Sequence, residues 1–147
     1  MKQAVRLVLG LLALSLVLLA TGVAQDQYTE GPVSRVTLVH ILPGHFNAFM
    51  EDLKTNIKPI LEAEKSSGLI VSYGIFLNQT KASIDDWDIG LITTYKNFAA
   101  LDDLGMKVLE LRMKQYGNKS KEQQVVDKRV ENGRSVASYL VRDITLK

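Results

Sequence analysis

One stretch, residues 36–76, constrains the fold of this chain more than any other. It opens with a short apolar run that Pro43–Gly44 closes. The residues that follow repeat apolar side chains at the spacing of one helix face, and Gly68 then precedes a second alternating run over residues 69–78. This order predicts a strand, a long amphipathic helix and a second strand.

The predicted helix places its apolar residues on one face. In sequence order, the members of this face are Phe46, Phe49, Met50, Leu53, Ile57, Ile60, Leu61 and Glu64. Only Glu64 is not apolar. Pro59 lies inside the helix, where its missing N–H predicts a kink. Because the apolar face stays in phase beyond Pro59, we expect one kinked helix that ends near Ser66.

The remainder of the chain supplies two more strands and further helical segments. Alternating or continuous apolar runs predict strands at residues 33–41, 69–78, 87–95 and 135–146. Helical periodicity predicts helices from residue 96, interrupted at Gly105, over 106–116 and over 120–131. Ser120 and Gln123 form a candidate capping box for the last helix. The order is β-α-β-β-α-β, which predicts an α+β, ferredoxin-like sandwich: a four-stranded antiparallel sheet with helices on one face.

Both faces of the first three predicted strands are apolar, whereas the helices suffice to cover one face. Large exposed apolar patches usually mark an interface. We therefore expect a homodimer in which two sheets face each other, with any ligand site inside the barrel that they enclose.

The first 24 residues have the pattern of a secretory signal peptide. Lys2 and Arg6 precede an apolar run over residues 7–20, and small residues lead to Ala24. We expect cleavage after Ala24 and export to a periplasmic or extracellular location. A retained membrane anchor is the alternative. Residues 25–32 would then be a flexible lead and residues 33–147 a single domain.

Composition limits the partners of the mature chain. Without Lys2 and Arg6, the chain's 18 basic residues fall to 16, which equals the 16 acidic residues. A net charge of zero argues against nucleic acid as a partner, because phosphate binding needs clustered excess cations. No second apolar run approaches membrane length, so no membrane association is expected after cleavage. Cysteine is absent, which excludes disulfides and thiolate metal sites.

Several local sequences resemble the dimeric α/β-barrel superfamily, whose best-known branch contains the antibiotic-biosynthesis-monooxygenase-like (ABM-like) proteins. They are the strand exit His40-Ile-Leu-Pro-Gly44, the long helix after it, and Asp86-Trp-Asp88 opening a strand that ends in Thr94-Tyr-Lys-Asn-Phe98. The resemblance covers residues 33–147. It implies the fold and the dimer but no single activity, because members include cofactor-free oxygenases, haem-degrading enzymes, haem peroxidases and proteins of unknown role.

Five residues are candidates for binding a ligand: His40, Tyr73, Trp87, Asp88 and Tyr95. Trp87 could stack on a planar molecule while Asp88 accepts a hydrogen bond, and the two tyrosines could present polar tips to a pocket. Each also has a structural reading, as a hydrogen-bonded core histidine or as packing residues. We favour the strand face with His40 and Tyr73 as the open one. No metal site and no cofactor are expected.

Three functions remain open on the sequence. The first is a secreted, non-catalytic binding or structural protein for a small apolar ligand. The second is a cofactor-independent monooxygenase-like enzyme acting on an aromatic or apolar molecule. The third is haem binding through His40. The haem-degrading branch uses an Asn, a Trp and a His, and Tyr95 in place of the Trp, with no histidine after it, argues against that activity.

Overall fold

The computed structural model describes residues 27–147, which divide into two compact units. The main unit is Pro32–Asp143. In the other, the described residues are 27–31 and 144–147, where the Lys147 amide donates to the Gln27 carbonyl at 3.1 Å. The predicted signal peptide lies outside the described residues and stays a prediction.

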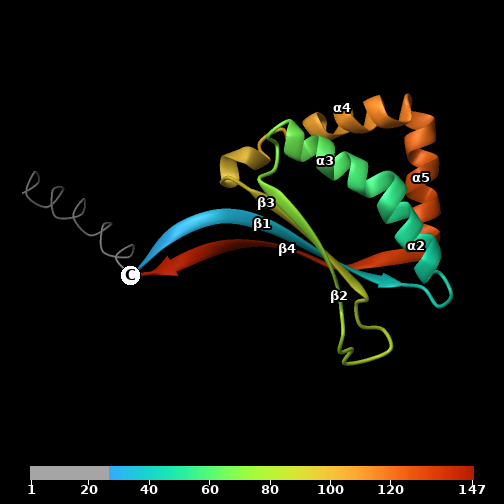
Figure 1. Cartoon of the computed structure of the whole chain (residues 1–147), viewed down its shortest axis with the longest axis horizontal. Coiled ribbons are helices and arrows are strands. Elements are labelled where there is room, and N and C mark those ends of the chain that lie inside the picture. Colours follow the sequence, from blue (N-terminus) through green and yellow to red (C-terminus); the bar gives the residue numbers. More distant parts are fainter. Residues whose placement is uncertain (1–26) are drawn as a thin grey trace, which may run out of the picture. The chain divides into compact units, whose positions relative to one another are not determined.

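The sheet has four strands in the order β2-β3-β1-β4, as the ferredoxin-like prediction requires (Figure 1). The strands are β1 (Tyr28–Ile41), β2 (Ser72–Leu77), β3 (Ile89–Tyr95) and β4 (Gly133–Leu146). β1 pairs with β3, and β3 with β2, both antiparallel. β1 begins at Tyr28, inside the stretch predicted to be a flexible lead. The predicted fold class is confirmed.

The helical segments lie on one side of the sheet in the main unit (Figure 1). They are α2 (Phe46–Asp52), η1 (Leu53–Ile57), α3 (Lys58–Ser66), η2 (Phe98–Leu101), α4 (Leu104–Tyr116) and α5 (Lys119–Asn132). Among residues 27–147, no helix has the length and apolarity needed to cross a membrane.

The long predicted helix forms, with a π-helical turn just before Pro59. In η1 the Lys58 N–H bonds the Leu53 carbonyl, five residues earlier. Pro59, which has no N–H, follows directly in the first turn of α3. The wider turn changes the angular phase between α2 and α3. The single apolar face is therefore wrong at its start: Phe46 and Met50 are 45% and 36% exposed.

Two helix boundaries differ from the predicted ones. The break before α4 lies at Asp103, which adopts a left-handed φ of 56°, while Gly105 continues the helix. At α5 the N-cap is Asn118, whose side-chain oxygen accepts from the Lys121 N–H at 2.9 Å. Asn is as good an N-cap as Ser. The predicted capping box at Ser120 is therefore wrong, because the helix begins two positions earlier.

Two apolar clusters fill the space between the sheet and the helices. One contains Ile41, Phe49, Leu53 and Ile89, and the other Leu61, Ile70, Tyr95 and Leu104. A bidentate ion pair between Arg129 of α5 and Asp52 of α2 joins the helices across the first cluster, with Nε–Oδ2 at 2.5 Å and Nη2–Oδ1 at 3.3 Å.

We predict that Leu53→Ala lowers the free energy of unfolding by about 2–5 kcal/mol, because Leu53 is 7% exposed and its removal leaves a cavity. Met50→Ala, three residues earlier but 36% exposed, is the matched control and should cost under about 1 kcal/mol. Urea denaturation measures both. Equal effects would show that the two residues share the buried face after all.

Candidate functional site

The register of the sheet decides which side chains can form a site. Tyr73 pairs with Thr93, and Thr93 pairs with Arg35. Because side chains alternate along each strand, the odd-numbered residues of β2, β3 and the paired part of β1 share one face. Arg35 and Thr93 line a cavity together with residues of α3 and α4, so this odd-numbered face is the one that the helices cover.

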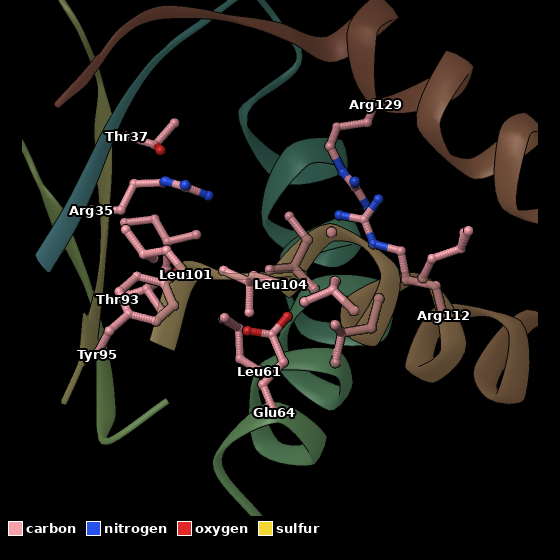
Figure 2. Close-up of a pocket in the computed structure, with 16 residues that line it drawn as sticks. Arg35, Thr37, Leu61, Glu64, Thr93, Tyr95, Leu101, Leu104, Arg112 and Arg129 are labelled. Atoms are coloured by element: carbon pink, nitrogen blue, oxygen red, sulfur yellow. The ribbon is translucent and has the colours of Figure 1, made fainter. Parts of the chain in front are cut away.

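A cavity of about 650 Å³ lies between this face and helices α3 and α4, within the range of small-molecule sites. Figure 2 shows the sheet on one side of it and the helices on the other. We name it the sheet–helix cavity. Its apolar lining residues are Ile57, Ile60, Leu61, Leu91, Leu101, Leu104, Val108 and Leu109, and its polar ones Arg35, Thr37, Glu64, Thr93, Tyr95, Arg112 and Arg129.

Three arginines line the sheet–helix cavity and differ in how well they are neutralised. Arg129 is held by Asp52 through two hydrogen bonds. Arg112 reaches Glu122 with one Nη1 contact at 3.3 Å, while its buried Nε has no hydrogen-bond partner in the described chain. The guanidinium of Arg35 lies 6.0 Å from the centre of the Tyr95 ring. Arg112 therefore retains an unused donor beside the cavity.

Glu64 is the acidic residue of this lining. It is only 7% exposed, and burial raises the pKa of its carboxyl, an effect that the charges of Arg112 and Arg35 partly offset. In Figure 2 its carboxylate points into the space between the sheet and the α4 arginine. A carboxyl with a raised pKa can donate a hydrogen bond when protonated or accept a proton from a bound molecule.

Tyr95 and Thr93 form the sheet wall of the cavity. They are 3% and 7% exposed, and burial raises the pKa of the Tyr95 hydroxyl, which keeps it protonated. Both hydroxyl groups are therefore neutral hydrogen-bonding groups. The geometry offers a ligand an apolar surface together with hydroxyl, carboxyl and guanidinium groups.

The structure does not bring the five predicted ligand-binding residues together. Tyr95 lines the cavity. Tyr73 lies on the same face, packed against the Leu61 cluster, and its hydroxyl donates to Glu62 Oε1 at 2.5 Å. His40 occupies an even-numbered position, on the opposite face. The prediction of one open face bearing both His40 and Tyr73 is therefore wrong, because the strand register separates them.

His40, Asp88 and Trp87 belong to a second group of contacts at the end of β1. His40 Nδ1 lies 2.9 Å from the Asp86 carbonyl and 3.2 Å from Asp88 Oδ2. Asp88 also accepts from the Ile41 N–H at 2.8 Å and pairs with Lys81. Burial acts to raise the pKa of Asp88, but the bonds from Lys81 and Ile41 outweigh it, so this pKa lies below its usual value.

Trp87 has a packing role beside that group. Its ring meets the Phe76 ring edge-on with centroids 5.6 Å apart, and the Phe76 ring lies over Gly90, where an added Cβ would come within 2.2 Å of it. Gly90 is thus required for this contact. None of His40, Trp87 and Asp88 lines the sheet–helix cavity.

Metal binding finds no support in the part of the chain that the structure describes. Within residues 27–147, no three or more His, Asp or Glu side chains gather closely enough to hold an ion. His40, the residue considered for haem binding, is only 7% exposed, and its Nδ1 lies within hydrogen-bond distance of the Asp86 carbonyl.

The residues that sequence reasoning missed are the charged ones. Arg35, Arg112 and Arg129 come from β1, α4 and α5, and nothing local in the sequence indicates that they converge. Glu64 did carry a signal: it was the single acidic member of an otherwise apolar helix face. An acid at such a position is costly unless its environment uses it.

No family model and no curated protein matches this chain. Several solved structures do. A NIPSNAP family protein with unknown function from Agrobacterium tumefaciens is 8% identical with a TM-score of 0.51, over 83% of this chain and 95% of that one. A dimeric protein of unknown function and ferredoxin-like fold from Bacteroides fragilis is 14% identical with a TM-score of 0.46, over 79% and 98%. A dimeric ferredoxin-like protein of unknown function from Jannaschia sp. is 15% identical with a TM-score of 0.44, over 77% and 98%. Likeness at such identity shows the fold alone.

Proposed function

We propose that this protein is a small binding protein that holds a mostly apolar molecule in the sheet–helix cavity without transforming it. The observation that carries this proposal is the cavity itself, about 650 Å³ in volume, with apolar side chains from five elements and seven polar residues around it. Sites of this size and character are typical of small-molecule binding. The proposal moves the ligand from the space between two sheets to the helix side of one sheet.

Catalysis is the alternative function for the same cavity. Glu64, with its raised pKa, could remove a proton from a bound molecule, which is a step that a cofactor-independent monooxygenase-like enzyme would use. The described residues supply no partner that orients Glu64 as a base: no hydrogen bond to its carboxylate oxygens accompanies the charges of Arg112 and Arg35. A binding function therefore fits the site better, because it does not need an oriented catalytic base.

Gly105→Leu tests the location of the site. Gly105 lines the cavity on α4, and a Cβ added there meets nothing within 4 Å. The leucine should occupy cavity space without straining the helix, and replacing a helical glycine should leave stability equal or higher. We expect the fluorescence of the neutral apolar probe N-phenyl-1-naphthylamine to rise with wild-type protein and the affinity to fall at least tenfold in Gly105→Leu.

Lys107→Leu, on an exposed position of the same helix, is the matched control and should bind the probe as wild type does. Unchanged binding by Gly105→Leu would place the ligand elsewhere. To test for oxygenase activity, the concentration of dissolved oxygen is measured in the same titrations, first with the probe and then with 1-naphthol as a candidate aromatic substrate. Oxygen consumption that depends on the protein would contradict the non-catalytic part of the proposal.

We also propose that the protein is a homodimer joined through the open face of its sheet. In the main unit, the even-numbered residues of β1, β2 and β3 include Val36, Leu38, Phe76 and Ile92 and no Lys, Arg, Asp or Glu. On β4, Arg142 reaches the Phe98 ring on the helix side, so alternation gives Tyr139 to the open face, where it is 54% exposed.

A second copy is the occupant that suits this face. The even-numbered residues of β1, β2 and β3 carry no charge, and the same alternation along β4 adds a single acidic residue, Asp143, so two copies bring largely uncharged surfaces together across a two-fold axis. An interface of standard size, about 800 Å² from each partner, gives a strong drive for association even after its entropic cost. These arguments support the dimer from the apolar surface alone.

Tyr139→Glu should convert the dimer to a monomer, since two-fold symmetry would bury two added charges in one interface. Met106→Glu is the control: it places the same charge at a 64% exposed position on α4, away from the sheet, and should leave the dimer intact. Light scattering at micromolar concentration gives the mass. A monomeric wild-type protein would remove the dimer from the proposal.

Export remains part of the proposal, on the strength of the basic, apolar and small-residue order of residues 1–24. Mass spectrometry of protein recovered after expression with an export machinery should find an N-terminus at Gln25. Soluble protein that retains Met1 would contradict cleavage.

A further inference from the structure

A second cavity adjoins the first beneath α2 and η1. Its volume is about 290 Å³, and apolar side chains such as Val39, Phe49 and Leu53 line it. Four residues line both cavities, namely Thr37, Ile57, Leu91 and Arg129. Shared walls mean that the two spaces are neighbouring compartments on the helix side of one sheet.

The two compartments differ sharply in charge. The sheet–helix cavity contains Arg35, Arg112 and Glu64. The second contains one charged residue, Arg129, whose guanidinium is already held by the carboxylate of Asp52. A single molecule that spans both would therefore need a polar end in the first compartment and an apolar end in the second.

The arginines of the first compartment set the sign of the polar end. Arg112 has a buried Nε without a hydrogen-bond partner in the described chain, and its one carboxylate contact uses Nη1. Arg35 contributes a second guanidinium, which lies 6.0 Å from the centre of the Tyr95 ring, and a ring contact leaves its N–H donors open. Guanidinium groups bind carboxylates with paired, charge-assisted hydrogen bonds.

We infer that the ligand is an elongated monoanion: a carboxylate bound by Arg112 and Arg35 in the sheet–helix cavity, on an unbranched apolar chain that enters the second cavity. This inference rests on the proposed binding function and narrows it to a class, medium-chain aliphatic carboxylates. Aromatic molecules without an anionic group are poorer candidates, because they offer no charged partner to the two guanidinium groups.

A chain-length series on the wild-type protein tests the second compartment. Butanoate, hexanoate and octanoate are titrated by calorimetry at constant pH. Each added methylene that enters an apolar cavity should tighten binding by about fourfold until the cavity is full. Affinity that does not change along the series would overturn the two-compartment assignment.

The charge is tested with the matched alcohol and with two variants. Octanoate should bind at least tenfold more tightly than 1-octanol, and Arg112→Gln should remove most of that difference. Lys114→Gln, the same charge change at an exposed position of α4, is the control and should keep it. Arg35→Gln provides a second, independent variant should Arg112→Gln perturb folding through its Glu122 contact.

The outcomes separate the two proposals. If N-phenyl-1-naphthylamine binds and is displaced from the cavity while octanoate has no advantage over 1-octanol, the binding function stands and the anionic ligand is rejected. If neither the neutral probe nor the carboxylates bind, both fall. An advantage of octanoate that survives in Arg112→Gln and in Arg35→Gln would show that other cations hold the anion.

Discussion

The pairing of Tyr73 with Thr93, and of Thr93 with Arg35, is the constraint on which the rest of this structure depends. Since side chains alternate along a strand, this register assigns every residue of three strands to a face. A slip by one position would exchange Arg35 for Ser34 and Tyr95 for Thr94 at the helix side. The polar groups that the sheet contributes to the sheet–helix cavity and the uncharged open face of β1, β2 and β3 are thus two consequences of one register.

Sequence reasoning succeeds where a structural feature depends on residues of one element, and fails where it depends on how separate elements pair or pack. The alternation around β1 and β3 and the spacing of Phe49, Leu53 and Leu61 were sufficient for the elements and the fold class. The common face assigned to His40 and Tyr73 was wrong, because the phase of one strand against another depends on which residues pair across the sheet. No property of either strand alone carries that information.

The helices show the same limit on a smaller scale. Asn118 and Ser120 are both competent N-caps, and only the observed bond from the Lys121 N–H to the Asn118 side chain decides between them. The π turn at Leu53 could not be predicted from a face that looked continuous in α-helical phase. The convergence of Arg112 and Arg129 depends on how α4 and α5 pack. Among the cavity's charged residues, only Glu64 stood out in the sequence, as the one acidic residue on an apolar helix face.

The proposed binding function would give the charges of the cavity a role that folding alone does not require. Exchanging a buried ionic group for a well-packed apolar one is often neutral or stabilising, so a chain selected only for stability has little reason to keep Glu64 on an apolar helix face. Its raised pKa means that burial penalises the ionised carboxylate more than Arg112 and Arg35 favour it. The folded state therefore holds this proton more tightly than the unfolded chain does, and Glu64 lowers stability once the pH rises above its usual pKa. A carboxylate bound beside the same arginines would add a second negative charge there and raise the pKa of Glu64 further. Occupancy by an anion and protonation of Glu64 would then favour each other, which gives this acid a role that an apolar residue could not fill.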